Sequence, residues 1–153
     1  MSLSVPPVPP RRLGPVAALI GSTLLLGGCG VESEPLVTVF SPGSGSVTVL
    51  PQCWSPDAVV SEQDCESTSN LGRLEVQPGA TIGVNVDPPI AELGWVPTVN
   101  GERLVARDLD GTYYRFALSE SSFAKSRDSA LEIYAVDDEQ KTRGLWVLQL
   151  TRR

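Results

Sequence analysis

The sequence predicts an all-β domain, an immunoglobulin-like antiparallel sandwich of about 7–8 strands, preceded by a cleaved N-terminal signal peptide. Two observations predict the sandwich: apolar residues recur with a period of two downstream of residue 36, and turn-forming residues interrupt the chain at intervals of roughly ten residues. An uncharged stretch near the N-terminus predicts the signal peptide. A small open barrel is the main competing architecture, since short strands at this spacing also build barrels.

The chain length allows one ordinary domain together with a targeting segment. The chain has 153 residues, of which 41% are hydrophobic and 20% charged, and this balance is typical of a protein that folds. Its 13 prolines and 14 glycines indicate many turns between short elements. We therefore expect a lipoprotein signal peptide at residues 1–28, a lipidated tether at 29–35 and the β-sandwich domain at 36–153.

Residues 1–28 have the layout of a secretory signal. Arg11 and Arg12 are the only charges before residue 13, and residues 13–26 are apolar or small throughout. This stretch is 14 residues long, whereas a membrane-spanning helix needs about 20 apolar residues, so it fits a secretory signal better than a permanent span. Because the two arginines are adjacent, export by the general secretory route and export by the twin-arginine route both stay open.

The segment ends in Leu26-Gly27-Gly28-Cys29, which places an aliphatic residue three before a cysteine and small residues directly before it. In these four positions the chain resembles bacterial lipoprotein precursors. The resemblance implies that Cys29 becomes the first residue of the mature protein and carries acyl chains that anchor it at the extracytoplasmic face of the cell membrane. A plain secretory signal with a chance cysteine, and a short N-terminal anchor helix, are the alternatives.

Cleavage before Cys29 would make the chain more acidic. The full chain has 12 basic and 18 acidic residues, and removal of residues 1–28 takes away two arginines, which leaves 10 against 18 and a formal charge of −8. Nucleic-acid binding depends on clustered Lys and Arg, so this balance argues against a nucleic-acid partner and against adhesion to anionic lipid headgroups. Membrane attachment is then expected through the acyl chains on Cys29 alone.

With Cys29 assigned to lipid, Cys53 and Cys65 remain as a pair in an oxidising compartment, where we expect a disulfide. Eleven residues separate them, and a bond that closes a loop of this size contributes roughly 2–3 kcal/mol. A zinc site is not expected, because the chain has no histidine. A redox motif is not expected either, since it would need a two-residue spacer.

The alternation of apolar and polar residues predicts the strands in order along the chain. The alternating apolar residues of successive strands are Val37 and Val39; Val47 and Val49; Leu74 and Val76; Ile82, Val84 and Val86; Tyr114, Phe116 and Leu118; Leu131, Ile133 and Ala135; and Trp146, Leu148 and Leu150. A hairpin is expected from residues 95–99 to 102–105, because Asn100-Gly101 supplies the two positive φ angles of a type I′ turn.

Proline, glycine and acidic residues mark the remaining connections. The expected turns or strand ends are at residues 42–46, Pro78-Gly79, Pro88-Pro89, Asp110-Gly111 and Asp137-Asp138-Glu139. The last of these, which precedes Lys141 and Arg143, is expected to join the final two strands. Only residues 57–64 and 119–130 could form a helical turn or two.

Taken together, several segments are similar to an actinobacterial lipoprotein family known only as a domain of unknown function. The segments that carry the resemblance are Leu26-Gly27-Gly28-Cys29 (the lipobox, the signal for lipidation), Val37-Thr38-Val39-Phe40, the Cys53/Cys65 loop, residues 72–79 and the final two strands. The resemblance covers nearly the entire mature chain and implies its location and fold. It supplies no catalytic residues.

The residue types needed for most hydrolytic chemistry are missing, because without histidine a serine or cysteine nucleophile lacks its usual general base. Four carboxylates next to turns, Asp87, Glu92, Asp108 and Asp110, could serve a glycosidase, but acidic residues are common in solvated turns. The segment 108–111 resembles the start of a calcium loop whose later ligands are absent. We therefore expect no enzyme activity, no catalytic or metal-ligating residue and no cofactor.

Aromatic residues offer the one hint of a binding surface. Most of the large ones are expected in the core, namely Trp95, Tyr114, Phe116 and Trp146. Trp54 lies in the disulfide loop and Tyr113 on the outward face of its strand, so both are candidate partner-binding residues. Trp54 could instead pack under the loop beside the disulfide.

These observations favour a membrane-anchored, extracytoplasmic and non-enzymatic binding module with an envelope protein or a glycan as its partner. The alternative is an accessory glycan-active or hydrolytic envelope enzyme that uses carboxylates. A pocket with two converging buried carboxylates would favour the enzyme, and an open sheet edge would favour the binding module.

Overall fold

The computed structural model describes residues 33–153 except 62, 64 and 66–70. The predicted signal peptide, Cys29 and the first part of the tether lie outside the described residues. Within the described part of the chain, no helix is both long and apolar enough to cross a membrane.

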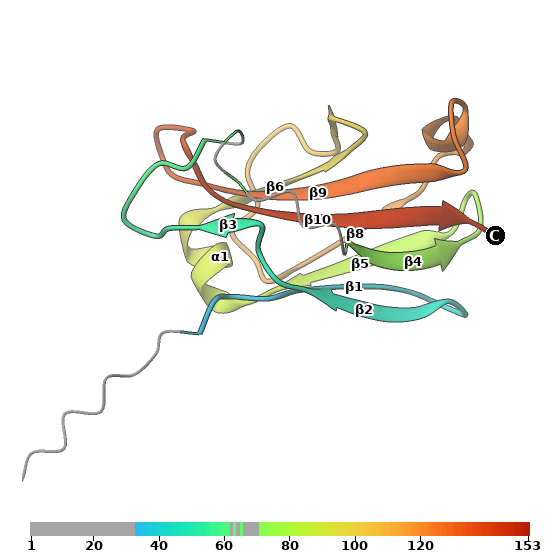
Figure 1. Ribbon diagram of the computed structural model, residues 1–153, viewed down its shortest axis with the longest axis horizontal. Helices are drawn as coiled ribbons and strands as arrows, with labels where there is room; N and C mark the ends of the chain where they lie inside the picture. Colours follow the sequence, from blue (N-terminus) through green and yellow to red (C-terminus); the bar gives the residue numbers. More distant parts are fainter. Residues whose placement is uncertain (1–32, 62, 64, 66–70) are drawn as a thin grey trace, which may run out of the picture. The chain divides into compact units, whose positions relative to one another are not determined.

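The described residues form two β-sheets that pack face to face (Figure 1). The elements in chain order are β1 (Val37–Ser41), β2 (Gly45–Val49), β3 (Cys53–Trp54), β4 (Gly72–Val76), β5 (Thr81–Val86), α1 (Pro88–Leu93), β6 (Trp95–Val99), β7 (Glu102–Arg103), β8 (Tyr113–Ala117), η1 (Glu120–Phe123, a 3₁₀ turn), β9 (Asp128–Val136) and β10 (Thr142–Arg152). The two-residue strand β3 was not expected, and β7, also of two residues, is shorter than expected.

The strand order confirms the predicted immunoglobulin-like sandwich. One sheet has the order β2-β1-β5-β8 and the other β3-β10-β9-β6-β7, with β4 also beside β10. Thus β5 and β6 follow each other in sequence but lie in opposite sheets, and so do β8 and β9. This alternation between a β1-β5-β8 layer and a β10-β9-β6 layer is the arrangement of immunoglobulin-like domains. The competing open barrel is not formed, because the strands separate into two sheets.

One strand pair departs from the expected antiparallel pattern. β4 runs parallel to β10, with Gly72 opposite Leu148 and Val76 opposite Arg152. The two-residue strand β3 pairs antiparallel with the beginning of β10, at Gly144 and Leu145. Both strands therefore lie along the same edge of β10, which at 11 residues is long enough to hold one at each end.

The predicted inner faces make up the core. Trp95 and Trp146 are fully buried, and Leu74, Ile82 and Leu131 lie in the same apolar cluster. Tyr114 and Phe116 are only half-buried, although they pack against this cluster. The exception has a structural cause: both are on β8, the outermost strand of its sheet.

The helix α1 was not expected. Pro88 and Pro89 do end β5, as predicted, but they also occupy the first helical positions, where proline costs nothing because those N–H groups lack intrahelical partners. Ile90 and Ala91 bury the inner face of this short helix against the sandwich. Of the two segments expected to hold a helical turn, residues 119–130 contain η1, and the described part of 57–64 contains no helix.

The Asn-Gly hairpin forms as predicted. Asn100 and Gly101 have φ angles of 51° and 78°, both in the left-handed region that a type I′ turn requires. The second arm of the hairpin is shorter than expected, since β7 ends at Arg103.

Candidate functional site

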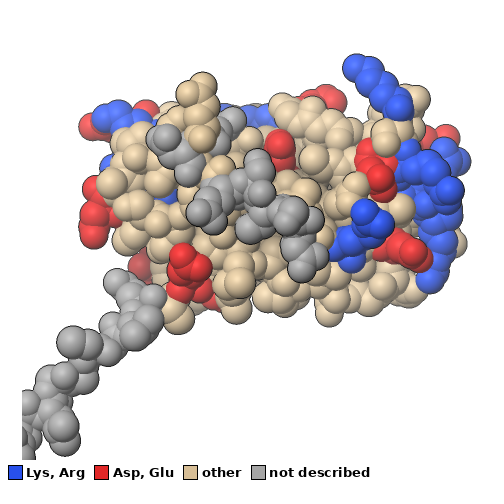
Figure 2. Space-filling model, in the orientation of Figure 1, with Lys and Arg blue, Asp and Glu red and all other residues tan. Residues whose placement is uncertain are grey.

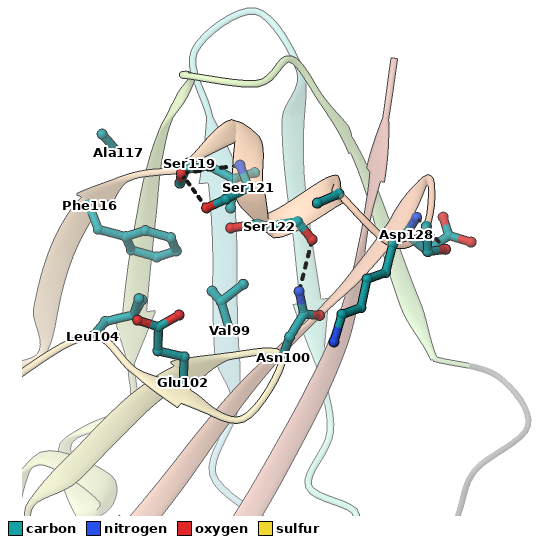
Figure 3. Close-up of a pocket in the computed structure, with 14 residues that line it drawn as sticks. Val99, Asn100, Glu102, Leu104, Phe116, Ala117, Ser119, Ser121, Ser122 and Asp128 are labelled. Atoms are coloured by element: carbon teal, nitrogen blue, oxygen red, sulfur yellow. Dashed lines mark hydrogen bonds between the residues drawn. The ribbon is translucent and has the colours of Figure 1, made fainter.

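A groove of about 680 Å³ opens between the β6–β7 hairpin, the end of β8 and the segment that carries η1 (Figure 3). Its lining comes from two stretches of chain, residues 99–104 and 116–128. The lining residues are Val99, Asn100, Glu102, Leu104, Phe116, Ala117, Leu118, Ser119, Ser121, Ser122, Ala124, Lys125, Ser126 and Asp128.

The groove lies where the two sheets are not bridged. β7 and β8 are the outermost strands of their sheets on this side. On the opposite side β4 packs closely on β2: a Cβ placed on Gly72 would lie 2.5 Å from Cγ1 of Val49 and 2.9 Å from Cγ1 of Val47. One side of the sandwich is therefore closed by direct contact, and the other side has a groove between the sheets.

The floor of the groove is apolar and its rim carries hydroxyl groups. Leu118 is buried, and Leu104 and Phe116 are half-buried above it. Serine side chains dominate the rim, and the hydroxyls of Ser119 and Ser121 lie 2.7 Å apart. Such a lining offers apolar contact and adaptable hydrogen bonding at the same time.

Asn100 holds the two walls of the groove together (Figure 3). Its side-chain amide donates to the carbonyl of Ser122 (2.9 Å), and its carbonyl oxygen accepts from the backbone N–H of Ala130 (2.9 Å). Its own backbone N–H donates to the Ala130 carbonyl (2.8 Å). One residue thus connects the hairpin tip, the η1 segment and β9.

The two carboxylates of the groove do not form a catalytic pair. Figure 3 shows Glu102 directed toward the Phe116 side, whereas Asp128 lies at the other end, beyond Ser122. Asp128 accepts a hydrogen bond from the hydroxyl of Thr151 (2.7 Å). A glycosidase needs two carboxyl groups that face one scissile bond, and these two point to different places.

The β8 edge beside the groove has unpaired backbone groups. Leu118 N–H donates to the Ala80 carbonyl and Val86 N–H donates to the Thr112 carbonyl, so the even-numbered residues of this segment face β5. In an antiparallel strand, alternate residues face opposite edges. Tyr113, Arg115 and Ala117 therefore direct N–H and C=O groups away from β5, and these groups have no partner among the described residues.

The four carboxylates suggested by the sequence do not gather at either of the two described cavities. Asp87 accepts a hydrogen bond from the backbone N–H of Leu36 (2.7 Å) and connects α1 to the start of β1. Asp108 is bound by the side chains of Arg103 and Gln140. Glu92 and Asp110 are exposed. The second cavity, about 130 Å³ beside residues 128–130 and 147–149, is too small for more than a side chain.

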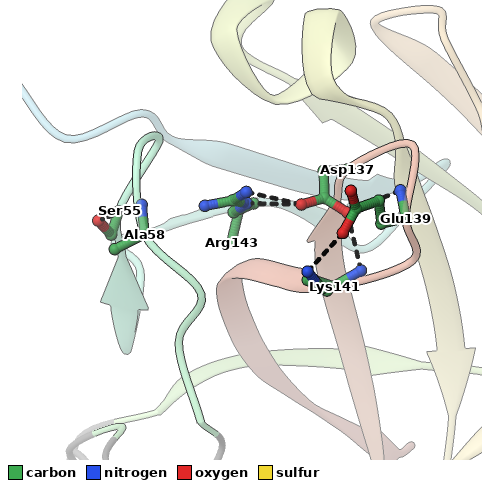
Figure 4. A network of polar contacts seen from close by, with 6 residues as sticks. All are labelled: Ser55, Ala58, Asp137, Glu139, Lys141 and Arg143. Carbon is green, nitrogen blue, oxygen red and sulfur yellow. Dashed lines mark hydrogen bonds and ion pairs between the residues drawn. The ribbon is translucent and has the colours of Figure 1, made fainter.

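The acidic turn between β9 and β10 is an ion-paired structural element (Figure 4). Asp137 Oδ1 accepts from the backbone N–H groups of Lys141 and Glu139 (both 2.9 Å), and Oδ2 accepts two bonds from Arg143 (2.7 and 2.9 Å). The Lys141 N–H is the largest of the causes that hold the pKa of Asp137 below its ordinary value of 3.8, against an opposing effect of burial. The predicted turn is thus present and fastened by the ionised carboxylate.

The disulfide between Cys53 and Cys65 is present, with the two Cα atoms 4.9 Å apart. The loop that it closes is held against β10, since Ser55 N–H donates to the Arg143 carbonyl (2.8 Å) and Val60 N–H to the Thr142 carbonyl (2.9 Å).

Trp54 packs under the disulfide loop, which was the alternative to a partner-binding role. It is half-buried, and its ring lies 5.5 Å from the ring of Trp146, centroid to centroid. Gly144 makes this contact possible, because a Cβ at that position would lie 2.7 Å from atoms of both indoles. Trp54 is therefore part of the packing beneath the disulfide loop.

Tyr113 is 50% exposed on the outer face of its sheet, where its ring stacks on Phe40 with centroids 6.2 Å apart. The structure does not bring the two candidate binding residues together, because Trp54 and Tyr113 belong to different sheets.

The groove between the hairpin and η1 was not predicted from the sequence. Its only signals in the sequence were the Asn100-Gly101 turn and the serines at 119–126, and neither indicates a shared surface.

A scan against protein-family models finds no match, and a search of curated proteins finds none either. Among solved structures, the chain is similar to one described as "Structures of Clostridium thermocellum CbhA fibronectin(III)-like modules". The two share 13% identity over 56% of this chain and 92% of that chain, with a TM-score of 0.41. A likeness this distant carries no argument about ligand or activity.

Proposed function

We propose that the mature protein is a lipid-anchored, extracytoplasmic binding module of the cell envelope, and that the groove beside β8 is its binding site. The observation that carries this proposal is the combination of an apolar, hydroxyl-rimmed groove with an unpaired strand edge along one wall. The location depends on the lipobox and on Cys29.

The geometry suits an extended partner segment. A strand laid beside β8 would meet the outward backbone groups of Tyr113, Arg115 and Ala117. Its alternate side chains would point into the groove, toward Leu104 and Phe116. Main-chain hydrogen bonds would then supply affinity and the groove would supply selectivity, as in other cases of strand addition.

The groove can be tested by photocrosslinking in intact cells, with a photoreactive residue in place of Ser121 at the rim. The matched control carries the same residue in place of Thr48, which is exposed on β2. We expect a reproducible envelope partner to be crosslinked from position 121 and not from position 48. Equal crosslinking from both positions, or none from position 121, would contradict the proposed site.

The anchor can be tested separately with Cys29→Ala. We expect the unmodified protein to be released from the membrane fraction and to lose incorporation of labelled fatty acid. Retention in the membrane without lipid label would favour an N-terminal anchor helix instead.

A further inference from the structure

Five exposed basic side chains gather at the end of the sandwich where β10 finishes (Figure 2). We call this surface the basic end, and its residues are Arg73, Lys125, Arg127, Arg152 and Arg153. The backbone ties the segments that carry them: Arg152 N–H donates to the Arg127 carbonyl (2.7 Å), and Arg153 N–H donates to the Val76 carbonyl of β4 (2.9 Å).

The charges of the basic end are poorly neutralised. Arg73 donates to the neutral side chain of Gln149 (2.8 and 3.2 Å), and Arg153 makes a loose ion pair with Glu75 (3.9 Å). Lys125, Arg127 and Arg152 have no carboxylate partner among the residues that the structure describes.

Three of the five cations elsewhere have a carboxylate partner, whereas Arg107 and Arg115 have none among the described residues. Arg103, Lys141 and Arg143 are each paired with a carboxylate. Half of the ten basic residues of the mature chain lie at the basic end, together with three carboxylates, Glu75, Glu120 and Asp128, which gives +2. The other described residues include five basic and eleven acidic ones, which gives −6, so positive charge is concentrated at one end of the described domain.

The basic end lies far from the point at which the N-terminal segment joins the domain. The Trp146 indole N–H donates to the carbonyl of Pro35 (2.9 Å), so the chain enters the sandwich beside the first half of β10. Arg152 is six residues further along that strand, or about 20 Å at the usual rise per residue. Figure 1 shows the start of β1 and the C-terminus at opposite ends of the sandwich.

We infer that the basic end binds an acidic polysaccharide of the cell envelope, and the choice of this partner rests on the proposed envelope location. The cations come from separate segments and are exposed, which suits a chain of repeated anionic groups better than one small anion. This surface lies about 20 Å from the point where the chain enters the sandwich.

The neighbouring groove supplies the second part of the recognition. Lys125 belongs to the basic end and also lines the groove, and its neighbour Ser126 lines the groove as well. The cations therefore lie next to the serine hydroxyls of the groove rim. Hydroxyl groups are suited to hydrogen bonds with sugar hydroxyls. The acidic remainder of the domain repels a polyanion that would cover more than this end.

The test measures binding of polygalacturonate to the mature lipidated protein in non-ionic detergent micelles, by isothermal titration calorimetry at two or more salt concentrations. The variant Arg127→Gln/Arg152→Gln/Arg153→Gln should weaken binding at least tenfold and flatten its dependence on salt, because fewer counterions are released. The matched control is Arg107→Gln, an exposed arginine away from the basic end, near the Trp95–Leu109 bridge. It should leave affinity unchanged.

Equal weakening by the control, equal affinity for neutral dextran, or no binding of polygalacturonate would overturn the inference. Tighter binding to vesicles of anionic phospholipid, or to an RNA homopolymer, would assign the surface to another partner and overturn it as well. The groove is judged independently by crosslinking from position 121. If polygalacturonate binds but position 121 gives no crosslink, only the groove proposal is contradicted. If position 121 crosslinks but polygalacturonate does not bind, only the inference about the basic end is contradicted.

Discussion

The two ends of the sandwich differ in how their charges are paired and in how closely their side chains pack. At the end that holds α1, the disulfide loop and the β9–β10 turn, charged side chains such as Asp137 and Arg143 satisfy one another, and Trp54 and Trp146 fill the space beneath. At the end that holds η1 and the last residues of β10, most of the cations have no carboxylate partner among the described residues, and the sheets leave a groove. The tighter packing and ion pairing therefore lie where the chain enters the domain, and the groove and cations to which we assign recognition lie at the far end.

The largest expected effect on stability comes from a substitution at the end that holds α1. Trp54→Ala should lower the free energy of unfolding by about 2–3 kcal/mol, because it opens a cavity beside Trp146 and leaves the disulfide loop without support. Urea denaturation of the oxidised protein measures this change. Tyr113→Ala, which removes an exposed ring, is the control and should cost much less. A Trp54→Ala protein as stable as the wild type would break the assignment of Trp54 to packing.

A smaller effect on stability is expected from a substitution at the groove. Asn100→Ala should cost about 1–2 kcal/mol and raise amide hydrogen exchange in residues 119–128, because the bonds to Ser122 and Ala130 are lost. Asn100→Gly keeps the positive φ angle of the turn and removes the same side-chain bonds, so it separates the two contributions. If Asn100→Gly exchanges as slowly as the wild type, the side chain does not hold the groove walls together.

The smallest effect concerns Asp137 and depends on pH. Since folding lowers the pKa of this carboxyl below 3.8, its ionised form stabilises the native state above that pH, and this contribution is lost as the pH falls through the folded-state pKa. The stability difference between wild type and Asp137→Asn should therefore be greatest near neutral pH and shrink in acid. Asp138→Asn makes the same change of charge at an exposed neighbour and should leave stability at neutral pH nearly unchanged. A constant difference for Asp137→Asn across this range would show that the ionised carboxylate is not responsible.

Much of the fold could be predicted because its signals are local. Period-two alternation at Leu74–Val76, Ile82–Val86 and Leu131–Ala135 marks buried faces regardless of which strands pair. The Asn100-Gly101 turn has its own backbone requirement, and Cys53 and Cys65 are close in sequence. The helix α1 escaped prediction because proline is both a strand terminator and a favoured first helical residue, and the local sequence does not separate the two.

The candidate site escaped prediction because its walls come from strands of different sheets. Leu104, Phe116 and Ser121 are unremarkable as single residues, and they share a surface only because β7 and β8 are unbridged edges of different sheets. The parallel pairing of β4 with β10 has the same origin, since alternation shows which face is buried and carries no information on the direction of a neighbouring strand.

The sequence by itself determined the all-β class, the inner faces, the hairpin turn and the disulfide, because each depends on spacing within a short stretch of chain. It also carries the lipobox from which the anchor at Cys29 is inferred. Only the tertiary structure decided that the unpaired edge of β8 borders a groove and that Arg73, Lys125, Arg127 and Arg152 meet at one end. Net charge and periodicity are sums and averages along the chain, whereas a binding surface depends on which distant segments the packing of two sheets brings together.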